Sequence, residues 1–133
     1  MPFVMDASVT VSRLLSDELH PVAVAAFDRF VEDTAMVPAI WWFEIRNMLV
    51  TNQRRGRIHA QRMAEALDML RQLPITIDHV PDSKLVIELA QDCRLSVYDA
   101  AYLELAVRHN LPLATLDEAM VRGAKAKEIP LIR

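Results

Sequence analysis

Four carboxylates stand at places in the sequence where they could do chemistry. Asp6 directly follows the apolar run Phe3–Met5, and Asp117 follows another short apolar run. Glu44 and Asp99 lie in segments whose apolar residues recur at helical spacing. In open α/β sheets, ligands bind outside the carboxyl ends of the strands. Acids that follow strands or begin helices there are therefore candidate metal ligands or catalytic groups.

The chemistry expected of such a cluster depends on a cation. Four carboxylates in one pocket repel each other and raise each other's pKa unless positive charge neutralises them. An all-oxygen ligand set suits Mg²⁺ or Mn²⁺, whereas zinc prefers histidine and cysteine. A site of this kind fits metal-assisted hydrolysis of phosphodiesters, in which the metal activates water and neutralises charge on the leaving oxygen.

Other site chemistries find little support in the composition. The single cysteine, Cys93, excludes an internal disulfide and is expected in the core. Only two glycines are present, which excludes a glycine-rich phosphate cradle. The four histidines have no ligand spacing and are expected on the surface; they are His20, His59, His79 and His109.

Asp6 and Glu44 each have a purely structural alternative. Asp6 could cap the helix that follows it, although Ser8 is also placed to do so. Glu44 shares a helix face with apolar residues, where an unpaired carboxylate would be costly to bury. A structural account would pair Glu44 with Arg46 or Asn47, but Arg46 is expected to point elsewhere on the helix. The tryptophans beside it, Trp41 and Trp42, are expected to be core anchors.

Asp99 and Asp117 lie in segments that resemble capping boxes. Ser96 and Asp99 have the spacing of a serine cap followed by an acid at the third helical position, which needs only helix physics. Thr115 and Glu118 form a second such pair, and this assignment leaves Asp117 without a capping role. Asp117 would then be available for a site at the end of its strand.

The elements that must position these acids alternate along the chain. Strands are predicted at 3–5, 35–38, 73–77, 111–114 and 129–132, and helices at 9–15, 22–31, 39–54, 59–71 and 83–93, from Ser96, and after the Thr115 cap to about Lys125. The first helix is expected to break at Asp17, Glu18, His20 and Pro21, with Pro21 suited to the first position of the next helix. Alternating strands and helices with continuously apolar strands predict an α/β fold with a parallel sheet.

Length and charge bound the remaining classes. A chain of 133 residues is expected to form one domain, residues 1–133. The net charge of −3 argues against a general nucleic-acid binder, unless a cation cancels several of the acids. The longest apolar run, 35–43, is too short to span a membrane, and the N-terminus does not resemble a signal peptide. The chain is expected to be soluble and cytoplasmic.

A basic cluster follows the helix that carries Glu44. Arg54, Arg55 and Arg57 stand at its C-terminal end, where cations interact favourably with the helix dipole. The same arginines, together with Arg46, could also contact phosphates.

Four motifs, "FVMDAS", "FEIRNML", "SVYDAAYLELA" and "LATLDEAM", occur in order over nearly the whole chain. Together they resemble the PIN-domain ribonucleases, and among these the VapC toxins of bacterial type II toxin–antitoxin pairs. The resemblance implies a three-layer α/β/α fold with a central parallel sheet. It also implies an endoribonuclease that depends on Mg²⁺ or Mn²⁺, a homodimer, RNA as substrate, and inhibition by a VapB-type antitoxin.

The resemblance also assigns roles to residues. The catalytic acids fall on Asp6, Glu44, Asp99 and Asp117. Asp6 and Asp99 are expected to hold the metal directly or through water, Asp117 to complete its site, and Glu44 to orient the attacking water. Ser8 and Thr115 match the small polar residues that support the first and last acids.

Two rival functions remain at this point. A degenerate PIN-like scaffold or a binding module with a structural divalent cation would use the same fold without catalysis. A full set of four acids favours the enzyme, because a scaffold has no reason to retain their mutual repulsion. A haloacid-dehalogenase-like phosphatase would place a second acid two residues after the first, where this chain has Ser8.

Overall fold

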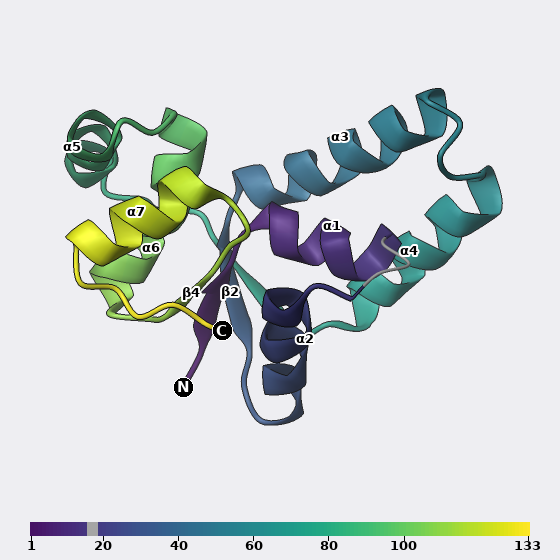
Figure 1. Ribbon diagram of the computed structural model, residues 1–133, viewed down its shortest axis with the longest axis horizontal. Helices are drawn as coiled ribbons and strands as arrows, with labels where there is room; N and C mark the ends of the chain where they lie inside the picture. The colour runs from purple at the N-terminus through teal and green to yellow at the C-terminus, as the bar shows by residue number, and fades with distance from the viewer. Residues whose placement is uncertain (16–18) are drawn as a thin grey trace.

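The computed structural model of the chain describes residues 1–15 and 19–133. The predicted helix break at Asp17 and Glu18 lies outside the described residues. Strands β1 (Phe3–Met5), β2 (Ala35–Pro38), β3 (Ile75–Asp78) and β4 (Leu113–Ala114) form a parallel sheet in the order β3-β2-β1-β4 (Figure 1). In the register of the central strand, Val4 lies beside Met36 on one side and Leu113 on the other.

Helices cover both faces of this sheet, which is why its strands are continuously apolar. They are α1 (Ala7–Leu15), α2 (Pro21–Asp28), α3 (Ile40–Arg54), α4 (Ala60–Gln72), α5 (Ser83–Cys93), α6 (Val97–His109) and α7 (Glu118–Ala126), with a 3₁₀ turn, η1 (Arg29–Val31), after α2. Along β1 the side chains alternate between two cores. Val4 packs in the larger core with residues of α3, α4 and α6, whereas Phe3 and Met5 pack against α2. The predicted three-layer α/β/α fold is therefore confirmed.

Several element predictions differ from the structure at their ends. The predicted strands at 73–77 and 111–114 begin later, at Ile75 and Leu113. The predicted strand at 129–132 is reduced to a single parallel bridge between Leu113 and Leu131. Its partner β4 has only two residues, and Pro130 has no N–H to donate to a ladder. The predicted helix 22–31 is α-helical only to Asp28 and then tightens into η1.

The predictions for the core residues hold with one exception. Trp41 is buried, and its indole Nε1 donates to Thr10 Oγ1 at 3.1 Å. Trp42 was expected in the core, but 43% of it is exposed, because the next position on the helix faces away from the sheet. Cys93 packs partly buried against the core as expected, and all four histidines are exposed.

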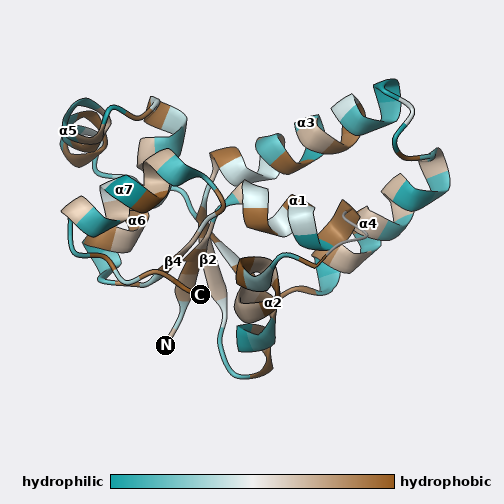
Figure 2. Ribbon diagram, viewed as in Figure 1, coloured by the Kyte–Doolittle hydropathy of each residue, from teal (hydrophilic) through white to brown (hydrophobic). Residues whose placement is uncertain are grey.

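The helices α3 and α4 form a hairpin that projects from the sheet (Figure 1). Figure 2 shows polar residues gathered at the outer end of this hairpin, away from the strands. In the described part of the chain, no helix combines the length and the apolar character needed to cross a bilayer.

Candidate active site

Asp6 lies at the carboxyl end of the central strand and is 4% exposed. Its Oδ2 accepts hydrogen bonds from Ser8 Oγ at 2.7 Å and from Thr115 Oγ1 at 2.9 Å. Burial raises the pKa of Asp6 to about 6; the two hydroxyls lower it, and the charges of Glu44 and Asp99 raise it further. Within residues 1–15 and 19–133, no ion pair involves Asp6.

The hydroxyls of Ser8 and Thr115 each donate one hydrogen bond and accept another. Ser8 was expected to cap α1, but the helix begins at Ala7, so Ser8 already lies inside its first turn. The Ser8 hydroxyl donates to Asp6 and accepts the N–H of Leu116 at 3.1 Å. Thr115 Oγ1 likewise donates to Asp6 and accepts the N–H of Asp117 at 3.0 Å. Both hydroxyls therefore tie the segment after β4 to the end of β1.

Helix capping does not account for Asp6. Its main-chain carbonyl accepts the N–H groups of Val9 at 3.1 Å and Thr10 at 3.3 Å. The carboxylate instead faces the two hydroxyls. The side chain of Asp6 is thus held in place by groups that can donate hydrogen bonds but carry no charge.

Glu44 has a partner that the sequence did not reveal. The phenol of Tyr102 donates to Glu44 Oε1 at 2.6 Å, joining α6 to α3. The structural pairing of Glu44 with Arg46 is wrong, because Arg46 donates to the carbonyl of Trp42 and stacks on its indole at 3.8 Å. Burial raises the pKa of Glu44, the Tyr102 hydrogen bond lowers it, and the charge of Asp99 raises it.

Tyr102 is fully buried, and burial followed by its hydrogen bond to Glu44 raises the pKa of its phenol. A signal for its role was present in the sequence. Tyr102 stands three residues after Asp99, so the two share a helix face, and a buried tyrosine hydroxyl needs a partner.

Asp99 lies half-buried in the first turn of α6. The predicted serine cap is confirmed, since Ser96 Oγ accepts the N–H of Asp99 at 3.0 Å. Burial raises the pKa of the Asp99 carboxyl, and the charge of Asp117 raises it further, while a hydrogen bond from Ser96 lowers it. The pKa of Asp99 is therefore affected by the charge of Asp117 as well as by the cap residue Ser96.

The expectation that Asp117 has no capping role is wrong. Asp117 is the N-cap of α7, and its Oδ1 accepts the N–H of Met120 at 3.0 Å. The helix begins at Glu118, two residues later than a cap at Thr115 would require. Thr115 Oγ1 instead accepts the N–H of Asp117 and donates to the carboxylate of Asp6.

The charges of the four acids affect one another's pKa in a series of neighbouring pairs. Asp6 is influenced by Glu44 and Asp99, Glu44 by Asp99, and Asp99 by Asp117. No group of three or more acidic, histidine or cysteine side chains among the described residues is placed to hold a metal ion as it stands. The donor set is nevertheless all oxygen and carries uncompensated negative charge, which suits a hard divalent cation.

The arginines predicted as phosphate contacts lie elsewhere. Arg54, Arg55 and Arg57 are exposed beyond or at the end of α3. At 1.5 Å per residue, Arg54 stands roughly 15 Å along the helix from Glu44. Arg46 lies nearer but is engaged with Trp42. The structure does not bring these four arginines to the acids.

An open parallel sheet with coupled carboxylates at its carboxyl edge defines an α/β domain with an acidic site, and comparisons with known proteins are consistent with it. The model of the PIN domain family matches residues 3–126. Ribonuclease VapC3 of Mycobacterium tuberculosis is 34% identical over 120 residues, which cover 90% of this chain and 85% of that protein. The chain belongs to the PIN domain family.

Solved structures share the fold at low sequence identity. VapBC2 from Rickettsia felis, bound to a DNA fragment from its promoter, matches with a TM-score of 0.68 and 12% identity, covering 98% of this chain and 97% of that one. VapC20 of Mycobacterium tuberculosis, a Sarcin-Ricin loop cleaving toxin, matches with a TM-score of 0.60 and 14% identity, covering 90% and 93%.

Proposed function

We propose that this chain is the toxin of a type II toxin–antitoxin pair, an endoribonuclease that hydrolyses RNA phosphodiester bonds with Mg²⁺ or Mn²⁺. The observation that carries the proposal is Asp6, a buried carboxylate with no basic partner among the described residues and with the charges of two further acids, Glu44 and Asp99, acting on it. The 34% identity to Ribonuclease VapC3 supports the same interpretation. Residues 1–133 would form one PIN domain that works in the cytoplasm.

The roles of the acids follow from their surroundings. Asp6 and Asp99 would hold the cation, directly or through water, and the second carboxylate oxygen of Asp117 would complete the site. A divalent cation, when bound, lowers the pKa of the attacking water and neutralises charge on the leaving oxygen. Glu44, fixed at Oε1 by Tyr102, would orient and deprotonate that water with Oε2.

Ser8 and Thr115 hold Asp6 in one rotamer, with its Oδ2 fixed by two hydroxyl donors. Their contribution is positional, because a carboxylate that must meet a cation and a phosphodiester loses efficiency if it can rotate away. The relay to Leu116 and Asp117 keeps the fourth acid in register with the first.

The test of this function is RNA cleavage by the purified chain. Cleavage is expected with added Mg²⁺ or Mn²⁺ and is expected to stop with EDTA. The exposed variant Asp68→Asn on α4 is the control for Asp99→Asn, which loses an acid of the site, and it should cleave like the parent. Cleavage by the metal-free protein, or none under any metal, would contradict the proposal and favour a scaffold role.

The proposed partners are a VapB-type antitoxin and a second copy of the chain. An arginine from an antitoxin tail would pair with the acids, since its fork matches carboxylates. For the second copy we assign an apolar groove of about 280 Å³ beside Glu44. Its lining includes Phe43 and Tyr98, which are 63% and 62% exposed. Phe43→Asp should shift a dimer to a monomer in light scattering, and an unchanged dimer would exclude this face.

A further inference from the structure

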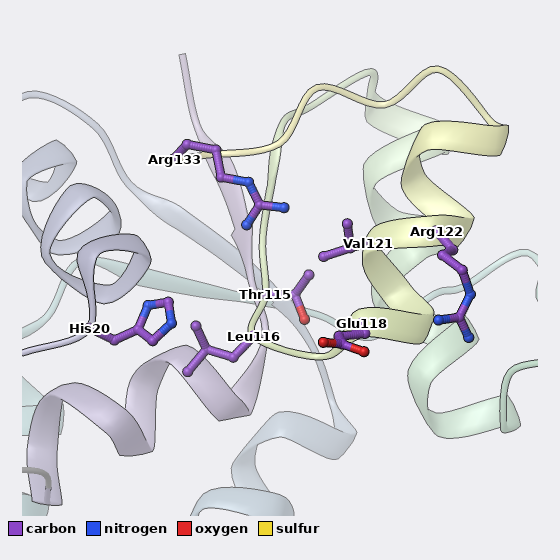
Figure 3. Close-up of a pocket in the computed structure, with 7 residues that line it drawn as sticks. All are labelled: His20, Thr115, Leu116, Glu118, Val121, Arg122 and Arg133. Carbon is purple, nitrogen blue, oxygen red and sulfur yellow. The ribbon is translucent and has the colours of Figure 1, made fainter.

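A second pocket adjoins the acids through Thr115. It has a volume of about 360 Å³ and lies between the start of α2, the segment after β4, α7 and the C-terminal residue (Figure 3). Thr115 lines this pocket and also donates its hydroxyl hydrogen to Asp6. A molecule in the pocket would therefore lie next to the acidic site without entering it.

The charged groups of this pocket are mainly basic. Arg122 and Arg133 line it, and neither takes part in an ion pair within the described part of the chain. In Figure 3 the guanidinium of Arg133 points toward Thr115, while Arg122 extends along the side of α7. Glu118 is the opposing charge, and its carboxylate also faces the pocket.

His20 adds a directed donor to the wall. Its Nδ1 accepts the N–H of Val22 at 3.1 Å, which makes His20 the N-cap of α2. An imidazole that accepts at Nδ1 carries its hydrogen at Nε2. His20 is exposed, so this second nitrogen remains available to a ligand in the pocket. The lining supplies two guanidinium groups and an imidazole N–H, which are donors of the kind that bind phosphate. In Figure 3 His20 and Arg133 lie on one side of α7 and the guanidinium of Arg122 on the other.

We propose that this pocket binds a backbone phosphate of the RNA strand, beside the phosphodiester that lies at the acids. The inference rests on the proposed function and names the contact that would hold its substrate. The acids repel an RNA strand, so the strand needs positive charge close to them. Arg54, Arg55 and Arg57 stand too far along α3 to supply it, whereas the pocket shares Thr115 with Asp6.

The experiment measures binding of a fluorescent single-stranded RNA of mixed sequence in Mg²⁺, in an Asp99→Asn background that suppresses hydrolysis. Arg122→Gln with Arg133→Gln is compared with Arg54→Gln with Arg55→Gln, which removes the same charge at the end of α3. The pocket pair should weaken binding about tenfold near 0.1 M salt. It should also make the slope of log affinity against log salt shallower by about 0.7 for each phosphate that is no longer bound. The control pair should change affinity less than about twofold.

Two single variants add a test of sign. Glu118→Gln removes the opposing charge and should tighten binding about threefold, whereas a pocket for a cation would respond in the opposite direction. His20→Asn retains a side-chain oxygen for the cap of α2 but loses the Nε2 donor, and should weaken binding about threefold.

Equal weakening by the two arginine pairs, or looser binding with Glu118→Gln, would overturn the inference. Cleavage is measured separately on chains that retain Asp99. A parent that does not cleave RNA contradicts the proposed function, whereas a parent that cleaves, with a pocket pair that binds like the control pair, contradicts only the phosphate pocket.

Discussion

Helix α6 contributes residues to two groups of acids, and the groups differ in the hydrogen-bond donors that hold them. Glu104 is 1% exposed and accepts a hydrogen bond from Arg108 Nε at 2.5 Å. Arg108 also donates to Asp78 Oδ2 at 2.6 Å, and the N–H of Asp82 donates to Glu104 at 3.1 Å. The hydrogen bonds to Glu104 and Asp78 raise the pKa of Arg108. In this group, Asp78–Glu104–Arg108, the protein itself supplies the cation that pairs with both carboxylates.

The other group has hydroxyls where the first has a guanidinium. Asp6 is held by Ser8 and Thr115, and Glu44 by Tyr102. Hydroxyl donors fix a carboxylate in place but do not cancel its charge. The comparison teaches that burial of an acid is not by itself a functional sign. A buried acid that the fold positions with neutral donors and leaves without a cation is the one that points to a ligand.

The largest expected effect is the loss of RNA cleavage when an acid of the proposed site is replaced. Asp99→Asn should reduce RNA cleavage by about a thousandfold or more, because it removes a carboxylate proposed to hold the cation. Its metal-free stability at neutral pH should be unchanged or higher, since a like charge is removed from the field of Asp117. Cleavage assays and urea unfolding in EDTA check both points. A variant that is less stable and still cleaves would make Asp99 only part of a helix cap.

The next prediction concerns the group Asp78–Glu104–Arg108, where a substitution should lower stability and leave RNA cleavage intact. Arg108→Met leaves Glu104 buried without its cation and should lower the free energy of unfolding by about 3 kcal/mol. The folded fraction should still cleave RNA, because Arg108 lies outside the proposed site. Urea unfolding gives the stability, and Arg71→Met, which removes an exposed partner of Asp68, is the matched control with an effect below about 1 kcal/mol. Equal effects of the two variants would remove the contrast between the groups.

A smaller effect concerns the neutral donors. Tyr102→Phe keeps the packed ring but leaves Glu44 without its hydroxyl donor, so the pKa of Glu44 should rise. We expect about tenfold slower cleavage at neutral pH, with the acidic limb of the pH–rate profile moved to higher pH. A profile that keeps its position would show that the Tyr102 hydroxyl does not set the pKa of Glu44, and an unchanged rate as well would leave Tyr102 a packing role alone.

Local patterns were enough to single out the four acids as candidates and to predict the strands β1 and β2 and the serine cap of α6. Each depends on neighbours within a few residues, such as the apolar run before Asp6 or the spacing of Ser96 and Asp99. The partner of Glu44 could not be found in this way, because Tyr102 lies 58 residues further along the chain.

The prediction that Asp117 has no capping role failed for a related reason. The Thr115 hydroxyl can accept a backbone N–H and donate to a carboxylate at the same time, and local spacing does not tell which N–H or which carboxylate lies near it. In the folded chain it donates to Asp6 and accepts the N–H of Asp117, while α7 starts at Glu118 with Asp117 as its cap. The acceptor Asp6 lies 109 residues away in the sequence, beyond the reach of a local pattern.

The most direct test of the central claim is the pH dependence of stability in the parent chain and in Asp6→Asn, measured with EDTA and with Mg²⁺. The pKa of Asp6 is raised from 3.8 to about 6 on folding, so the folded state binds the proton more tightly than the unfolded state. In EDTA the parent should therefore lose up to about 3 kcal/mol as pH rises from about 4 through about 6. Asp6→Asn should lose less stability over this range, because only the raised pKa values of Glu44 and Asp99 remain, and Mg²⁺ should stabilise the parent above pH 6 but not the variant. A parent that gains stability over that range, or that responds to Mg²⁺ no more than Asp6→Asn does, would contradict the claim that this carboxylate is held uncompensated for a cation.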